Sequence, residues 1–120
     1  MRTLGASLTG THAALITIEA RFEPRDRERT EILLTGLPDP VLRESRGRLE
    51  SALEENGLAI GAGRLFLNLV PASLRKSGEI LDLPLALACA AACGYFEPKL
   101  LKHALFLGEL GIDGRLHAVP

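Results

Sequence analysis

The sequence of 120 residues contains no tryptophan, a single tyrosine and four phenylalanines. A core without large aromatic side chains has to be built from aliphatic ones, chiefly leucine, isoleucine, valine and alanine. Apolar residues make up 47% of the chain and charged residues 24%, which is the profile of an ordinary soluble globular domain. A chain of this length forms one domain that buries roughly two-thirds of its unfolded surface.

The chain also lacks an excess of charge and a long apolar run. Its formal net charge is -1, so the molecule as a whole does not attract nucleic acid or a membrane surface, although this leaves room for a local basic patch. The longest apolar stretch, residues 83–93, is far too short to span a bilayer. The N-terminus has no sustained apolar segment of the kind found in signal peptides. We therefore expect a cytoplasmic protein with no membrane partner.

Cysteine is nearly absent, with only Cys89 and Cys93 in an alanine-rich run. On a helix these two residues share a face, where the geometry for a direct disulfide is poor. No further cysteine or histidine lies near them, so they do not predict a metal site. We interpret both as buried free thiols, which suits a reducing compartment.

Three segments alternate between apolar and polar residues and are predicted as strands: 12–22, 31–35 and 64–70. The first helix is expected to begin at Pro40, with Asp39 as its N-cap, and to end at Asn56-Gly57.

The second half of the chain predicts a helix over residues 83–93, capped by Asp82 and apolar nearly all round, so that it should be central and buried. A helical turn at residues 98–103 and two strands, 104–110 and 115–119, follow, with a tight turn at Asp113-Gly114.

The predicted order is β-β-α-β-α-β-β, which is an α+β domain with a mixed sheet and two main helices on one face. The last predicted strand runs to Pro120 with no tail. We therefore expect residues 1–120 to be a single domain cut from a longer protein.

Motifs for common chemistry are missing. No Gly-x-x-x-x-Gly-Lys-Ser/Thr loop is present to bind the phosphates of ATP, and the glycine-rich segment 57–63 lacks the lysine and hydroxyl, so it is interpreted as a turn. His12, His103 and His117 lie on separate elements, and we expect them at the surface rather than in a catalytic or metal site.

The segment 71–78 is the best catalytic candidate, because it places Ser73 and Ser77 beside Lys76 just before a buried helix. A serine nucleophile can use a desolvated lysine as its base. However, Arg75 is adjacent, the segment is polar, and an exposed lysine stays protonated at neutral pH. Loop serines mostly bond to the local backbone, so we expect no catalytic residue here.

Arg43, Arg46 and Arg48 on the first helix are candidate contacts to DNA phosphates, which would carry no sequence preference. The same helix holds as many acids as bases. That pattern is typical of a solvated face with i,i+4 ion pairs, which is the favoured alternative.

A series of motifs resembles, in order and spacing, the magnesium-chelatase-like AAA+ ATPases of the competence protein ComM group. The resemblance covers the chain from about Leu4 to Pro120, and residues 68–87 are its most specific part. The motifs are Gly36-Leu37-Pro38, Glu44-Ser45-Arg46 with Arg48, Ser51-Ala52-Leu53, Asn56-Gly57, Asn68-Leu69-x-Pro71-Ala72, Lys76-x-Gly78, Asp82-Leu83-Pro84-x-Ala86-Leu87, Gly108-Glu109-Leu110 and Asp113-Gly114.

This resemblance implies an N-terminal domain similar to the second domain of ribosomal protein S5 and to the Lon protease domain, with a left-handed crossover. It also implies an AAA+ module after residue 120 that binds ATP and magnesium, and a hexameric parent that drives DNA branch migration during natural transformation. The domain itself would be a non-catalytic accessory that contacts its own AAA+ module, neighbouring subunits and DNA. It would need no cofactor of its own, and magnesium chelation is not implied.

Lon carries a serine in the loop that leads into the buried helix, whereas residues 81–84 contain no hydroxyl. The position of Lon's lysine falls beyond Pro120. The family-motif loop residues here are Asn68, Pro71, Lys76, Gly78 and Asp82, and Ser73 and Ser77 replace acidic residues usual in the family. The alternatives are a Lon-like serine hydrolase remnant that uses Ser73 or Ser77 with Lys76, or a nucleic-acid-binding module that uses the three arginines.

Overall fold

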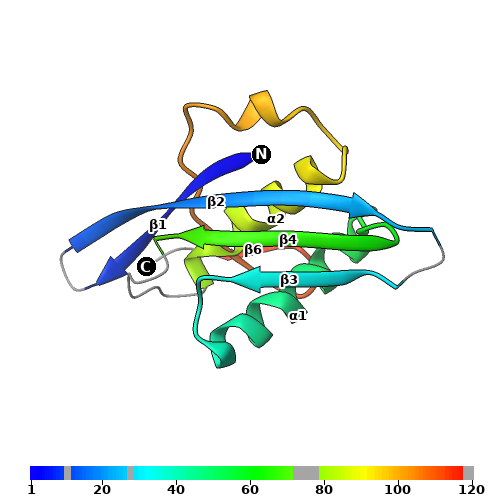
Figure 1. The fold of residues 1–120 in the computed structure, drawn as a ribbon. Helices are drawn as coiled ribbons and strands as arrows, with labels where there is room; N and C mark the ends of the chain where they lie inside the picture. Colours follow the sequence, from blue (N-terminus) through cyan, green and yellow to red (C-terminus); the bar gives the residue numbers. More distant parts are fainter. Residues whose placement is uncertain (10–11, 27–28, 72–78, 118–120) are drawn as a thin grey trace.

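The structure, a computed structural model, describes residues 1–9, 12–26, 29–71 and 79–117. Its main element is a mixed sheet in which β2 is antiparallel to both of its neighbours, β1 and β4, while β3 is parallel to β4. The strands lie side by side in the order β1-β2-β4-β3 (Figure 1). The predicted α+β class with a mixed sheet is confirmed. The strands are β1 (Arg2–Thr9), β2 (His12–Pro24), β3 (Glu31–Thr35) and β4 (Gly63–Val70).

Two helices cover one face of the sheet and lie behind it in Figure 1. The first, α1 (Asp39–Glu55), joins β3 to β4, and α2 (Asp82–Ala92) follows the 3₁₀ turn η1 (Glu79–Leu81). When Figure 1 is given a quarter-turn clockwise, β3 and β4 point upward, β4 lies to the right of β3 and α1 lies behind the sheet. The crossover from β3 through α1 to β4 is therefore left-handed. Crossovers between parallel strands are usually right-handed, and a left-handed one is what the resemblance led us to expect.

The core lies between the sheet and the helices. Alternate residues of the strands point inward, and the register places Ile18 opposite Leu69 and Ile32 opposite Leu65. Leu85 of α2 is fully buried against them. The fully buried hydrophobic side chains of the described residues are aliphatic or sulfur-containing, which confirms the prediction of an aliphatic core.

β1 was not predicted from the sequence, although it pairs with β2 along its whole length. Its inward positions carry Thr3 and Gly5 instead of large apolar residues, so the alternation is weak. A Cβ on Gly5 would lie 2.8 Å from Cδ2 of Leu81 and 3.1 Å from Cγ of Pro84. Glycine thus allows the beginning of α2 to pack directly on β1.

Two boundaries differ slightly from the prediction. Pro38 takes the N-cap position of α1 and Asp39 is already helical, so the helix begins one residue early. α2 ends at Ala92, with Cys93 as its C-cap.

Both cysteines are free, as predicted, but Cys93 is only half-buried while Cys89 is fully buried. Burial raises the pKa of both thiols.

The C-terminal part forms the 3₁₀ turn η2 (Pro98–Leu101) and a two-stranded ribbon of β5 (Glu109–Leu110) and β6 (Leu116–His117). The turn agrees with the predicted helical turn at residues 98–103. The tight turn at Asp113-Gly114 joins the two short strands, and residues 118–120 lie outside the described part of the chain.

The strand predicted over residues 104–110 is wrong for most of its length. Only an isolated bridge joins Leu105 to Leu4 before β5 begins. The N–H of Phe106 donates to the carbonyl oxygen of Leu4 at 3.0 Å, and the N–H of Gly108 donates to that of Ile80 at 3.1 Å. Because these bonds go to two different elements, the segment cannot form one continuous ladder.

Candidate functional site

A buried carboxylate lies at the beginning of α2. Asp82 is 0% exposed, and Arg48 of α1 donates to it through Nε to Oδ2 at 2.8 Å and through Nη2 to Oδ1 at 3.0 Å. The backbone N–H of Leu110 in β5 also donates to Oδ2, at 3.2 Å. One carboxylate therefore joins α1, α2 and the β5–β6 ribbon, and we call this group of three residues the Arg48–Asp82 clamp.

Charge and burial act in opposite directions on the clamp. Burial raises the pKa of the Asp82 carboxyl, while the hydrogen bonds from Arg48 and from the Leu110 N–H lower it. The pKa of the Asp82 carboxyl is, on balance, raised above its ordinary value. For Arg48, the hydrogen bond to Asp82 raises the pKa of the guanidinium above its ordinary value. Ser45, which is 0% exposed, lies beside the guanidinium, with Nη2 of Arg48 at 3.5 Å from its Oγ. Both oxygens of the Asp82 carboxylate therefore accept hydrogen bonds within the protein.

The prediction that Asp82 caps α2 is wrong. Asp82 is the first residue of the helix, and Leu81 holds the N-cap position with helical dihedral angles of φ -89° and ψ -5°. The turn η1 runs straight into α2, so the extended backbone that an N-cap residue normally adopts is missing. The negative charge of a carboxylate in the first turn still interacts favourably with the positive end of the helix dipole.

The three arginines predicted as phosphate contacts do not form one group. Arg48 is committed to Asp82 and its side chain is 21% exposed. Arg43 is exposed and Arg46 half-exposed, and neither forms an ion pair with any residue in the described part of the chain. Any phosphate contact on α1 would therefore come from Arg43 and Arg46.

The open face of the sheet carries a row of polar side chains that crosses all four strands. Arg2 pairs with Glu19 at 3.6 Å, Asn68 Nδ2 donates to Glu19 Oε1 at 3.1 Å, and Thr35 Oγ1 donates to Asn68 Oδ1 at 2.7 Å. We call Arg2, Glu19, Asn68 and Thr35 the polar row. The side chains of the row bond to one another across neighbouring strands, so the row stabilises strand pairing.

Next to the polar row, the guanidinium of Arg21 lies over the ring of Phe66, 4.8 Å from its centroid. A hollow of about 260 Å³ opens there, lined in part by Met1 and Arg21. The sequence alone did not reveal this face, because its partners lie up to 49 residues apart.

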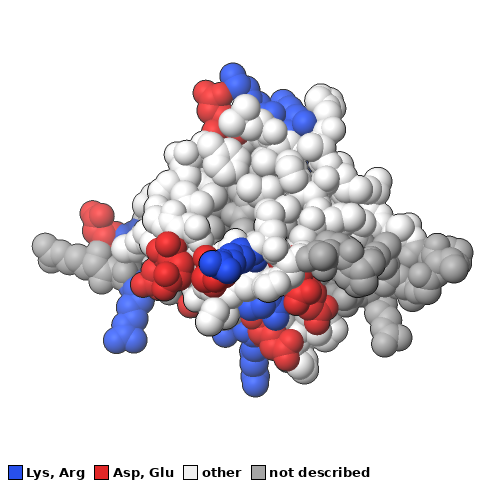
Figure 2. Space-filling view, turned by 180° about the vertical axis from the view of Figure 1, so that it is seen from behind, with Lys and Arg blue, Asp and Glu red and all other residues white. Residues whose placement is uncertain are grey.

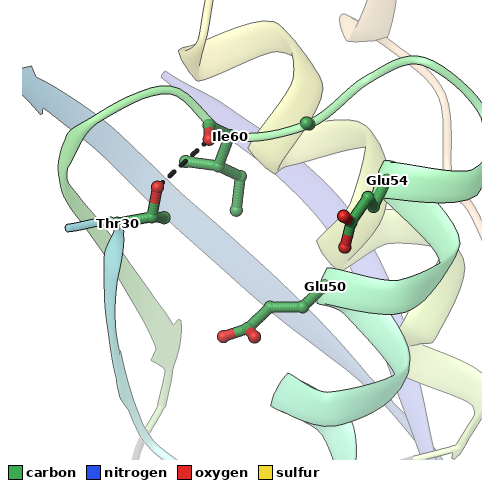
Figure 3. A pocket seen from close by; sticks show the side chains of 5 residues that line it. Thr30, Glu50, Glu54 and Ile60 are labelled. Atoms are coloured by element: carbon green, nitrogen blue, oxygen red, sulfur yellow. Dashed lines mark hydrogen bonds between the residues drawn. The ribbon is translucent and has the colours of Figure 1, made fainter.

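A second hollow, of about 240 Å³, lies between α1 and the loop before β4. Figure 3 shows Glu50 and Glu54 projecting from α1, with Thr30 and Ile60 across from them. The Thr30 hydroxyl lies 3.1 Å from the Ile60 carbonyl oxygen and 2.8 Å from that of Gly61. Among the described residues no three His, Cys, Asp or Glu side chains come together in a way that could hold a metal ion.

Comparison with known proteins identifies the family. The family model described as subunit ChlI of Mg-chelatase matches residues 19–120. The chain belongs to this family. It is 34% identical over 110 residues to competence protein ComM of Haemophilus influenzae and 33% identical over 111 residues to YifB of Escherichia coli K12, in each case over 92% of the chain. It is also 35% identical over 118 residues, or 98% of the chain, to protein Mb2921c of Mycobacterium bovis. The membership expected from the motifs is confirmed.

The chain spans only about a fifth of the length of these ChlI-family relatives, 21% of ComM and of YifB and 23% of Mb2921c. The aligned region thus corresponds to one part of each relative.

The family-motif residues lie in two separate places. Asn68 belongs to the polar row on the open face of the sheet, and Asp82 belongs to the clamp on the helical side. Pro71 follows β4, and the peptide bond between Val70 and Pro71 is cis. Lys76 and Gly78, with Ser73 and Ser77, lie outside the described residues. Of the described members of the ChlI-family motif, Asn68 and Asp82 therefore lie on opposite sides of the sheet.

Ser51, His103 and His117 lie apart from the clamp and from the polar row. Ser51 Oγ donates to the carbonyl oxygen of Ile112 at 2.6 Å. His103 and His117 are exposed, as predicted, and the side chain of His12 is outside the description. No helix in the described part of the chain has both the length and the apolar character needed to cross a membrane.

Proposed function

We propose that this chain is a non-catalytic accessory domain of a magnesium-chelatase-like AAA+ ATPase. The observation that carries the proposal is the state of Asp82 at the beginning of the buried helix, the region where Lon has its serine. Its carboxylate is buried and bonded to Arg48 and Leu110, so it is not free to attack a substrate or move a proton. Family membership supports the same conclusion about the type of parent protein.

The finer fold assignment is that the domain is similar to the second domain of ribosomal protein S5 and to the Lon protease domain. The order β1-β2-β3-α1-β4-α2 and the left-handed crossover between β3 and β4 support this assignment. Left-handed crossovers are rare enough that this feature narrows the choice of related folds considerably.

We further propose that the domain helps an AAA+ ring to assemble or to engage DNA during branch migration in natural transformation. The support is the likeness to a relative that is named as a competence protein. In this proposal a cytoplasmic parent binds ATP and magnesium in a separate module, and this chain contributes contacts to that module, to neighbouring subunits and to DNA phosphates.

The test is a titration of labelled branched DNA with the protein at two salt concentrations. Phosphate contacts release counterions, so binding through Arg43 and Arg46 has to weaken as salt rises. The Arg43→Ala/Arg46→Ala variant should lower the affinity and flatten the salt dependence. Arg2→Ala is the matched control, since Arg2 is exposed but paired on the opposite face of the sheet. Binding that both variants leave unchanged would remove DNA engagement through α1 from the proposal.

Non-catalytic status has its own test. ATP turnover by residues 1–120 would contradict it, and so would covalent labelling by a serine-reactive phosphonate. The second result would instead support a Lon-like hydrolase that uses Ser73 or Ser77 with Lys76. A serine hydrolase of known activity serves as the positive control in the labelling experiment.

A further inference from the structure

The outer surface of the two helices carries an apolar groove. It has a volume of about 210 Å³ and is lined mainly by aliphatic and aromatic side chains from α1, α2 and the segments that flank them. Figure 2, which views the molecule from the helical side, shows a broad surface without Lys, Arg, Asp or Glu above a charged lower edge. The lining residues used below are Leu83, Leu87, Phe96 and Leu110.

The β5–β6 ribbon extends this groove with exposed apolar side chains. Ile112 is 69% exposed and Leu116 is 61% exposed. A Cβ on Gly108 would lie 3.0 Å from Cβ of Leu83 and 3.3 Å from Cδ2 of Leu116, so these two leucines flank the same point. Leu116 of the ribbon therefore lies at the edge of the groove.

The ribbon is held firmly in this position. Its backbone accepts a hydrogen bond from Ser51 Oγ of α1, 2.6 Å from the Ile112 carbonyl oxygen, and one from Nδ2 of Asn56, the C-cap of α1, 2.9 Å from the Asp113 carbonyl oxygen. The clamp fixes Leu110 as well. Apolar side chains that the fold holds toward water in a continuous patch are typical of a docking surface.

We infer that this surface is the docking site for an apolar helix face supplied by the part of the same polypeptide that lies C-terminal to residue 120. A groove between two packed helices accepts the ridge of a third helix, with anchors at i, i+3, i+4 and i+7. The part of this chain that aligns with ComM and YifB makes up 21% of each, so these ChlI-family relatives are more than four times as long as the chain. The inference rests on the proposed function in one respect, namely that this chain is part of a longer protein.

The position of β6 favours an occupant from the same chain. Leu116 is in β6, the last strand that is described, and lies at the rim of the groove beside Leu83. A segment attached so close has a high effective concentration at the groove and can dock there without a second molecule. The occupant is expected to be apolar on the docked face, because the groove offers carbon surface rather than charge.

The test is hydroxyl-radical footprinting of the full-length protein, which compares Leu116 with Leu15. Leu15 is 63% exposed on the opposite side of the sheet, so in this chain the two side chains are matched in type and in exposure. Docking takes a leucine from this exposure to that of a core residue, roughly one-tenth or less, so Leu116 should be labelled about sixfold more slowly than Leu15. Phe96 and Leu87 should be protected in parallel, at a level that does not change on dilution.

A variant separates docking from folding. Ile112→Asp/Leu116→Asp places two charges on exposed side chains and should restore the labelling of Phe96 and Leu87 in the full-length protein. Leu15→Asp is the matched control and should leave the protection intact. Equal labelling of Leu116 and Leu15 in the wild type would overturn the inference, and protection that disappears on dilution would assign the surface to a second copy. Neither result depends on DNA binding or ATP turnover, so failure here and failure of the proposed function are distinguishable.

Discussion

Replacing Arg48 by methionine is the most direct test of the clamp. Methionine keeps an unbranched apolar side chain and removes the guanidinium. Asp82 would then lose the two hydrogen bonds from Arg48 and retain only the one from the Leu110 N–H. Because the carboxyl is fully buried, water cannot replace the lost donors. Burial already raises the pKa of this carboxyl, and loss of the charge and hydrogen bonds of Arg48 should raise it further.

The expected cost follows from this burial. Removing one partner of a buried ion pair lowers the free energy of unfolding by about 3–5 kcal/mol. The Arg48 side chain is 21% exposed, so part of the pair is already solvated, and we expect a loss near the lower end of that range. For a domain of this size, about 3 kcal/mol corresponds to a fall in Tm of roughly 10–15 °C.

The assay is urea unfolding at neutral pH, followed by far-UV circular dichroism, on the wild type, Arg48→Met, Asp82→Leu and the double variant. The double variant leaves no buried charge, so it should lose less stability than the two single variants together, with a coupling energy of about 2 kcal/mol. Arg115→Met is the control. Arg115 pairs with Asp113 at 3.4 Å on the surface, and its removal should have no measurable effect. An unfolding midpoint of Arg48→Met equal to that of the wild type, or strict additivity in the cycle, would refute the clamp as described.

Three further experiments test the packing. Gly5→Val should lower the free energy of unfolding by about 1–3 kcal/mol, since a Cβ there meets the beginning of α2 at 2.8 Å. Gly47→Ala, in a helix with nothing within 4 Å, should instead raise it by about 0.5–1 kcal/mol, and thermal melts that gave both variants the same sign would contradict this account. Leu85→Ala should cost about 2–5 kcal/mol in a denaturant titration, whereas Leu100→Ala at an exposed site should not move the midpoint. The Cys89 thiol, whose pKa burial raises, should resist a thiol-reactive disulfide reagent until the protein unfolds, and rapid labelling of the native protein would show that α2 is not the central helix.

Local patterns in the sequence were sufficient for most of the sheet and both helices. The alternation in β3 and β4 follows the buried face, with Ile32, Leu34 and Leu65 pointing inward, so period-two reasoning located these strands within a residue. The breaker pair Asn56-Gly57 likewise ended α1 at the correct place. These elements were predictable because their signals lie within a few neighbouring residues.

β1 and the segment over residues 104–110 were not predictable in this way. β1 owes its strand conformation to pairing with β2, and Gly5 in its middle is favourable only because α2 packs on it. In the C-terminal segment, Leu105 and Phe106 belong to a short apolar run typical of a strand, yet their partners lie on β1 and only one bridge forms. Tertiary contacts decided both cases, and propensity did not.

The clamp is a third kind of case, in which the residues were noticed but their roles were not. Asp82 stands before Leu83-Pro84, a pattern typical of an N-cap, and Arg48 stands among other arginines on an amphipathic helix. The two are 34 residues apart, so no local pattern joins them. Only the packing of α1 against α2 shows that each provides the charge that the other needs.

The clamp and the apolar groove are parts of one structural unit, and this has a consequence for function. Leu110 bonds to Asp82, while Ile112 and Asp113 bond to α1, so three contacts fix the β5–β6 ribbon to the two helices. Loss of the clamp should therefore loosen the ribbon and weaken docking at Leu116. Arg43 and Arg46 lie on α1 without ion pairs among the described residues, so phosphate contacts there do not depend on the ribbon. A clamp variant that lost protection of the groove but kept salt-sensitive DNA binding would separate the two surfaces, whereas loss of both together would mean that α1 itself depends on Asp82.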